Sequence, residues 1–309
     1  MLPSPADSGE DRPGGPGPPS GDGGLMAAPV ADAFAVAPQV PTQLSVRSGG
    51  CFARPLPLDG SCAGAARRFF REAVAGMGMP GDLVHDGITM ASELAANTMH
   101  AQGNVEFGSN RLRPVTGFPE LWIYLRGTGA RCELVCKVYD SQPGWRTGDL
   151  YTGELPDPTK HALEGVNGRG LQVVNGLSAG QWGYHPTRAR LGSWKVPGKA
   201  VWFSLRLPPA CDVVRSGRPR MSAARAVDEL EAMLTGRGIG GRMVRVDEPA
   251  VDMAVLSVRR DLTVWLRSCT VSWKKPDGSY ERRELSDLED VAEQIVCTHE
   301  ELDATGARA

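Results

Sequence analysis

Four consecutive residues near the middle of the chain have the composition of a phosphate-binding turn. They are Gly168, Arg169, Gly170 and Leu171, and they open a segment with helical periodicity. Glycine lets a backbone approach a phosphate closely, and a helix N-terminus offers unpaired N–H groups and a positive dipole end. Arg169 would add a charge-assisted contact. A lone Gly-Arg-Gly indicates only a turn, so the phosphate-binding interpretation depends on the residues that precede it.

Three polar residues earlier in the chain fall on or near one face of an expected helix. Glu93 and Asn97 are four residues apart and therefore share a helical face, and His100 lies near it. By itself this stripe is typical of a solvated helix surface. Asp140 follows next, at the end of an apolar strand where a lone carboxylate needs a partner. Gly144 comes four residues after Asp140. These residues, followed in order by the Gly168-Arg169-Gly170 turn, indicate a phosphate-binding site more specifically than any one of them does alone.

Hydrophobic periodicity predicts the elements that position these residues. Helices are expected over residues 62–74 with Ser61 as N-cap, from Asp82 to between His100 and Gly103, and from Gly170 onward. Strands are expected over residues 51–56, 121–126, 132–139, 181–184 and 199–207, with a long polar loop over residues 141–167. The expected fold is a two-layer α/β sandwich, in which a mixed, mostly antiparallel sheet carries three helices on one face.

Composition divides the chain into five parts. Residues 1–47 are rich in Pro, Gly, Ser and Asp and are expected to be a disordered tail. Residues 48–210 form the domain that carries the motifs, and residues 211–222 form a linker. Residues 223–303 form a small α+β domain of unknown role, and residues 304–309 form a tail. In the small domain, helices are expected over 223–234 and 287–301, strands over 243–246, 251–258, 262–273 and 280–283, and a hairpin turn at Asp277-Gly278.

The bulk properties of the chain limit its function classes. Its 309 residues carry a formal charge of −2, which gives no basic field for nucleic acid. No apolar run approaches the roughly 20 residues that span a bilayer, and no secretory signal is evident, so a cytoplasmic location is expected. The seven cysteines are scattered and are interpreted as reduced core residues.

The order of motifs resembles the ATPase domain shared by gyrase, a heat-shock chaperone, sensor histidine kinases and a DNA-mismatch protein family, called GHKL. The resemblance covers roughly residues 50 to 208. It implies that Asn97 coordinates Mg²⁺ at the phosphates of ATP and that Asp140, with Gly144, binds adenine. Gly168, Arg169, Gly170 and Leu171 would lie at the ATP lid and the phosphates. The chain departs from the family pattern at three positions. His100 lies three residues after Asn97, whereas the family usually has a histidine four residues after the asparagine. Gln142 replaces the first glycine of the adenine motif, and Ala200 stands where a threonine commonly lies near adenine.

Within that family the chain is most similar to the anti-sigma-factor serine/threonine kinases and their relatives in high-GC Gram-positive bacteria. This resemblance implies that Glu93 is the catalytic base acting on a hydroxyl of a partner protein, of the sigma-factor or anti-sigma-antagonist type. The alternative is a nucleotide-gated module that sequesters a partner without phosphotransfer. Neither direct nucleic-acid binding nor membrane association is expected, and a homodimer is left open.

Overall fold

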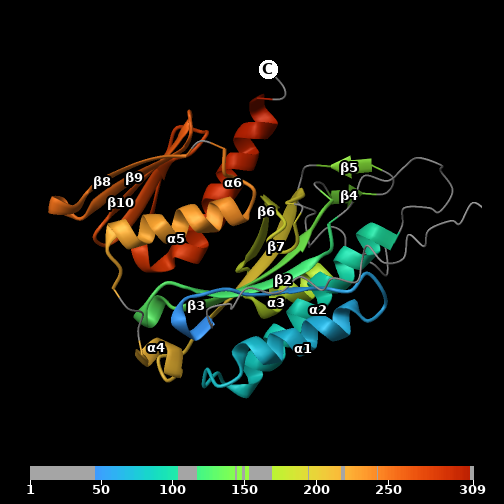
Figure 1. Ribbon diagram of the computed structural model, residues 1–309. Coiled ribbons are helices and arrows are strands. Elements are labelled where there is room, and N and C mark those ends of the chain that lie inside the picture. Colours follow the sequence, from blue (N-terminus) through green and yellow to red (C-terminus); the bar gives the residue numbers. More distant parts are fainter. Residues whose placement is uncertain are drawn as a thin grey trace, which may run out of the picture. The chain divides into compact units, whose positions relative to one another are not determined.

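The computed structural model of the chain describes residues 46–103, 117–142, 145–147, 150–152, 169–193, 195–216, 220–241 and 243–306. All of these residues belong to one compact unit, residues 39–309. It is an α/β structure with two five-stranded antiparallel sheets and helices packed against them (Figure 1). Residues 1–45 of the predicted tail, Gly144, Gly168 and most of the predicted loop lie outside the described residues. The prediction of a disordered tail is wrong for Val46 and Arg47, which begin a 3-10 helix.

The first sheet carries the predicted strand residues of the N-terminal domain. Its strands, in spatial order, are β1 (Phe52–Pro55), β2 (Glu120–Arg126), β3 (Glu133–Asp140), β7 (Pro197–Arg206) and β6 (Trp182–Arg188). Each neighbouring pair is antiparallel. The expectation of a mixed sheet is therefore wrong for the described strands. Within the predicted loop, β4 (Trp145–Thr147) and β5 (Leu150–Thr152) form a separate two-stranded sheet.

Three helices pack on one face of the first sheet, as predicted. They are α1 (Cys62–Val74), α2 (Gly81–Gly103) and α3 (Arg169–Leu177). The helices α1 and α2 approach closely at Gly87, where an added Cβ would lie 2.1 Å from Cζ of Phe70. Ser61 occupies the N-cap position of α1 without a side-chain capping bond, and its N–H and hydroxyl both donate to Asp59 instead. The start of α1 is therefore organised by Asp59.

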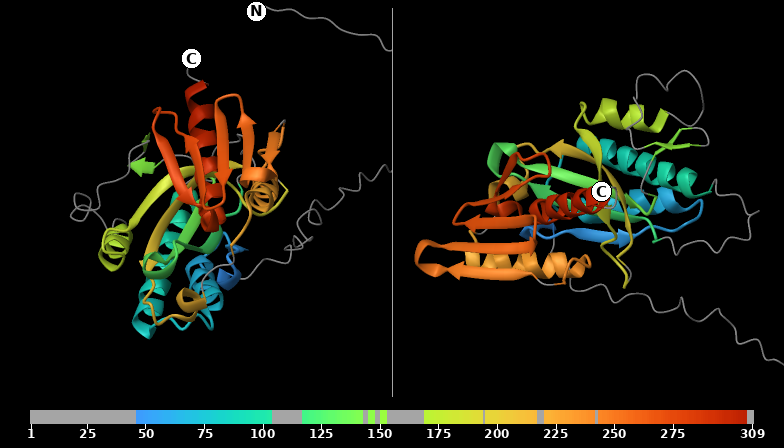
Figure 2. Two further views of the ribbon diagram at one scale, coloured as in Figure 1. Left: turned by 90° about the vertical axis from the view of Figure 1, so that its left-hand side faces the viewer. Right: turned by 90° about the horizontal axis from the view of Figure 1, so that it is seen from above.

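The opposite face of the first sheet is also covered. Side chains alternate along β2, so Leu121 and Ile123 join the core beneath α1 and α2, whereas Trp122 and Tyr124 point to the other side. There they meet α6 (Leu288–Gly306), whose Asp290 accepts a hydrogen bond from the Tyr124 hydroxyl at 2.9 Å. The left view of Figure 2 shows α6 and the helices α1 and α2 on opposite sides of this sheet. The expected two-layer arrangement is therefore wrong, because α6 adds a layer on the second face of the sheet.

The second sheet belongs to the C-terminal part of the chain. Its strands, in spatial order, are β12 (Tyr280–Glu284), β11 (Thr270–Lys274), β10 (Leu262–Arg267), β9 (Met253–Arg259) and β8 (Val244–Glu248). One face packs against α5 (Ala223–Gly236) and α6 in a second apolar core. The single strand predicted over residues 262–273 is two strands with a turn at residues 268–269. The predicted turn at Asp277-Gly278 is confirmed, because Gly278 has φ +87° and Asp277 accepts from the N–H of Ser279.

Two segments differ from the expectation. The predicted linker over residues 211–222 contains the short helix α4 (Asp212–Ser216), and α6 continues to Gly306, past the predicted domain end at residue 303. The remaining elements are the short 3-10 helices at Val46–Ser48, Gly129–Arg131, Pro249–Val251 and Leu285–Asp287. Within the described ranges, every helix is too short or too polar to cross a bilayer.

Candidate functional site

The polar pair on α2 meets the first turn of α3. Glu93 and Asn97 are half-buried, and Gly170, the second residue of α3, is buried. A Cβ added to Gly170 would lie 2.9 Å from Oε2 of Glu93 and 3.2 and 3.3 Å from Nδ2 and Oδ1 of Asn97. The backbone at the start of α3 therefore runs directly past both side chains, and the absence of a side chain at Gly170 makes this approach possible.

The two polar groups have no partner in the part of the chain that is described. Neither the carboxylate of Glu93 nor the carboxamide of Asn97 has a hydrogen bond or ion pair to another described residue. Both lie beside the N-terminal end of α3, where unpaired N–H groups and the helix dipole favour negative charge. Arg169 is exposed at the first position of α3, and Leu171 is half-buried against the core. The arrangement can bind an anion together with a cation that prefers oxygen ligands.

Asp140 has a different environment from the one expected. It ends β3, is 2% exposed, and forms a buried ion pair with Lys199, whose Nζ lies 2.9 Å from Oδ2. Its Oδ1 accepts from the backbone N–H of Gln142 at 2.9 Å, and Lys199 also donates to the carbonyl of Gln142 at 2.7 Å. The carboxylate therefore closes the turn after β3, in addition to any contact with a ligand.

The strand register explains why Lys199 was missed. Asp140 pairs with Lys199 across β3 and β7, whereas Ala200, the residue singled out from the sequence, pairs with Tyr139. At the neighbouring Gly198, an added Cβ would lie 2.2 Å from the carbonyl oxygen of Asp140, so the two strands are in close contact there. The available signal was a single lysine at the start of an apolar strand, which becomes informative only when its cross-strand partner is known.

A buried polar cluster on the α6 side of the first sheet was not foreseen. Glu293 of α6 pairs with Arg237 at 2.7 Å and accepts from the Thr187 hydroxyl at 2.5 Å. Nζ of Lys137 lies 2.8 Å from Nε2 of His185, whose Nδ1 lies 3.0 Å from the carbonyl of Pro186. These bonds define a neutral His185, with Nδ1–H donating to the carbonyl and Nε2 accepting from the lysine.

The charges in this cluster are coupled. Burial and the neighbouring Lys137 lower the pKa of His185 to about 4. Burial alone would raise the pKa of Glu293, but the charges of Arg237 and Lys137 outweigh it and hold that pKa well below its usual range. The side chains of Glu293 and Arg237 are at most 5% exposed. We therefore interpret the cluster as part of the packing between α6 and the sheet.

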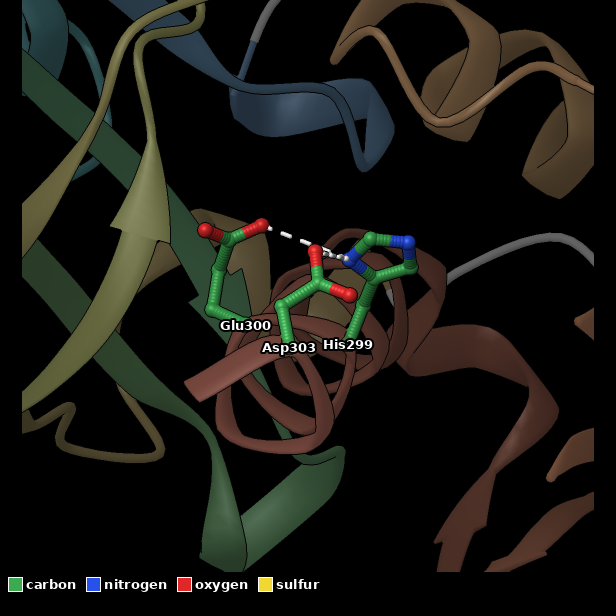
Figure 3. A group of neighbouring side chains, drawn as sticks. All are labelled: His299, Glu300 and Asp303. Atoms are coloured by element: carbon green, nitrogen blue, oxygen red, sulfur yellow. Dashed lines mark hydrogen bonds and ion pairs between the residues drawn. The ribbon is translucent and has the colours of Figure 1, made fainter. Parts of the chain in front are cut away.

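His299, Glu300 and Asp303 on α6 form the group that most resembles a metal centre among the described residues (Figure 3). Nδ1 of His299 lies 3.4 Å from Oε1 of Glu300 and 3.3 Å from Oδ2 of Asp303. Both carboxylates already pair with arginines: Arg188 contacts Glu300 and Asp303, and Arg259 contacts Asp303 at 2.5 Å. The two guanidinium groups would repel a divalent cation. We therefore interpret the three side chains as members of an ion-pair network rather than as a metal site.

Comparison with known proteins adds no assignment to this geometry. The chain matches no protein-family model, no curated protein and no solved structure. Any functional proposal therefore depends on the residues themselves, and above all on the contact between α2 and the start of α3.

Proposed function

We propose that residues 48–210 form a nucleotide-binding domain of the GHKL type and that it binds Mg-ATP between α2 and the start of α3. The observation that supports this proposal is the contact of Glu93 and Asn97 with Gly170. Residues from two predicted motifs, about seventy positions apart in the sequence, lie so close together that a Cβ at Gly170 would touch both side chains. A packing contact between two helices does not need a half-buried carboxylate and carboxamide without partners, whereas a ligand site does.

The side chains present fit the two components of Mg-ATP. The start of α3 offers backbone N–H groups and, through Arg169, a guanidinium for the phosphates. Asn97 offers a neutral oxygen of the kind that Mg²⁺ accepts, together with water and phosphate oxygens. When bound, Mg²⁺ neutralises charge on the phosphates. Glu93 lies next to Asn97 and can accept the proton of a hydroxyl that approaches the terminal phosphate.

The activity we propose is phosphotransfer to a serine or threonine of a regulatory partner, of the sigma-factor or anti-sigma-antagonist type. The unpaired carboxylate of Glu93 favours this candidate, because a general base must be free to take a proton. The second candidate is a nucleotide-gated module that binds such a partner without phosphotransfer. The departures from the family pattern at Gln142 and Ala200 favour the second candidate, because nucleotide binding survives them more readily than phosphotransfer does.

Replacing Gly170 with alanine should weaken Mg-ATP binding by about tenfold or more, which corresponds to about 1.4 kcal/mol. The new Cβ would contact Glu93 and Asn97 and displace the groups that hold phosphate and metal. Alanine is otherwise favoured over glycine inside a helix by about 1 kcal/mol, so the fold should be retained. Isothermal titration calorimetry of the full chain, combined with thermal unfolding, measures both effects.

Gly176 provides the matched control for Gly170. It lies on the same helix and nothing lies within 4 Å of an added Cβ, so Gly176→Ala should bind Mg-ATP like the wild type. The proposed site is wrong if the folded wild type gives no binding heat with Mg-ATP or Mg-ADP. It is also wrong if Gly170→Ala binds as tightly as Gly176→Ala.

The wild type should bind ATP more tightly than GTP by about 1–3 kcal/mol, the range for a hydrogen bond to a charged group. Adenine presents an amine donor to Asp140, whereas guanine presents an oxygen acceptor at the same position. Competition between the two nucleotides for the wild type is the better measurement, because Asp140→Asn would leave Lys199 buried without its counter-charge. Equal affinity would show that Asp140 does not contact the adenine amine.

A further inference from the structure

Among the described residues, helices cover only one face of the second sheet. Side chains alternate along its strands, so Val264, Leu266 and Trp273 enter the core with α5 and α6, and their neighbours point outward. On this outer face Trp265 lies opposite Ser272, which in turn lies opposite Arg282, and Arg267 lies opposite Thr270. These residues surround a hollow of about 320 Å³, lined by Trp265, Arg267, Thr270, Ser272, Tyr280 and Arg282.

The hollow is cationic and its charges are available. Arg267 and Arg282 are exposed, and neither has an ion pair or side-chain hydrogen bond to any residue in the described ranges. Other arginines of the same sheet are paired: Arg259 with Asp303, and Arg283 with Glu281. No carboxylate lines the hollow. Two guanidinium groups without local counter-charges therefore lie on one small surface.

The nearest outward-facing acid on the same strand does not neutralise them. Glu284 follows Arg282 on the same face of β12, but its Oε1 pairs with Arg131 at 2.6 Å and its Oε2 accepts from the Thr128 hydroxyl at 3.0 Å. Its charge is thus engaged outside the hollow. Trp265 and the 69% exposed Tyr280 place aromatic surface beside the two arginines. Tryptophan, tyrosine and arginine are the residues that contribute most to binding energy at protein interfaces.

We propose that this hollow binds an acidic peptide segment of a protein partner. Carboxylates of the segment would pair with Arg267 and Arg282, its apolar side chains would lie on Trp265 and Tyr280, and its backbone would contact the hydroxyls of Thr270 and Ser272. A nucleic acid fits less well, because the chain carries a formal charge of −2 and two arginines make a local site rather than a basic stripe. The proposal goes beyond nucleotide binding, since the hollow contains no residue of the nucleotide site.

Fluorescence anisotropy of the full chain tests the proposal. The probe is a fluorescein-labelled dodecapeptide pool in which each position is Glu, Asp, Ser or Phe. The reference pool has Gln and Asn in place of the acids, and a third probe is a labelled oligodeoxythymidylate of the same length. We expect saturable binding of the acidic pool that weakens as salt is raised, and much weaker binding of the uncharged pool and the oligonucleotide.

Variants locate the binding surface. The double variant Arg267→Gln with Arg282→Gln, and separately Tyr280→Ala, should each weaken binding of the acidic pool by about tenfold or more. Arg260→Gln removes the same charge from an exposed turn of the same sheet and should bind like the wild type. The proposal is overturned if the wild type does not bind the acidic pool, if the double variant binds it as Arg260→Gln does, or if the oligonucleotide binds more tightly. Titration of the same variants with Mg-ATP measures the nucleotide site independently, so failure of one proposal can be distinguished from failure of the other.

Discussion

Replacing Glu93 with glutamine should lower phosphoryl transfer by roughly 10²–10⁴-fold, the usual contribution of a positioned general base, and leave Mg-ATP affinity largely unchanged. A base acts in the transition state and adds little to binding of the ground state. Glutamine keeps the size of the side chain beside Gly170, so the contact between α2 and α3 should persist. The rate is measured as transfer of labelled phosphate from ATP to candidate partner proteins of the proposed anti-sigma-antagonist type.

Asn97→Ala is the complementary variant. It removes the proposed protein ligand of Mg²⁺, so the metal-dependent part of the nucleotide affinity should fall, and turnover at saturating nucleotide should be less affected than in Glu93→Gln. Unchanged turnover in Glu93→Gln would rule out Glu93 as the base and give it a structural role. If the wild type binds Mg-ATP but transfers phosphate to no candidate partner, the nucleotide-gated binding module is the better description.

Glu293→Gln should destabilise the fold by about 3–5 kcal/mol, the usual cost of removing one partner from a buried ion pair. Arg237 and Lys137 would lose their buried counter-charge, and Thr187 would lose a carboxylate acceptor. Glu301→Gln is a suitable control, because Glu301 is exposed on the same helix. Equilibrium denaturation of both variants gives the difference in unfolding free energy. Equal stability of the two would mean that the cluster contributes nothing to folding.

The same cluster should make the protein sensitive to acid. His185 faces Lys137 from β3 and Glu293 and Asp290 from α6, and Glu293 is itself paired with Arg237 after α5. Its pKa falls from 6.5 to about 4 on folding, so between these pH values the unfolded chain binds a proton that the folded chain does not. The stabilisation is therefore complete above pH 6.5, and about 3 kcal/mol is lost as the pH falls to about 4. His185→Gln should flatten this slope, and identical slopes for both proteins would contradict it.

Local patterns predicted the elements that hold the candidate site. Apolar spacing located α1 and α2 within one or two residues, and the order of motifs placed Glu93 and Asn97 on one helix and Gly170 at the start of another. The two motifs come together because α3 packs against α2, and neither motif by itself predicts that packing. Lys199 was missed for the same reason, since its relation to Asp140 exists only in the register of β3 with β7.

The second covered face of the first sheet also had a signal in the sequence. Residues 121–125 read Leu-Trp-Ile-Tyr-Leu, an unbroken apolar run, and all five are buried. Such a run is typical of a strand with both faces covered, whereas a sheet with one solvated face alternates apolar and polar residues. The pattern shows that something covers Trp122 and Tyr124, but not which segment does so, because α6 lies more than 160 residues further along the chain.

The position of α6 has a consequence for synthesis of the protein on the ribosome. The first sheet is complete in sequence at Arg206, whereas α6 ends at Gly306, one hundred residues later. At typical translation rates this interval lasts about 5–20 s. During that time the nascent chain can form the sheet and its helices α1–α3, but Trp122, Tyr124 and Lys137 have no cover. That apolar face therefore remains exposed until the C-terminal helix has been synthesised and packs against it.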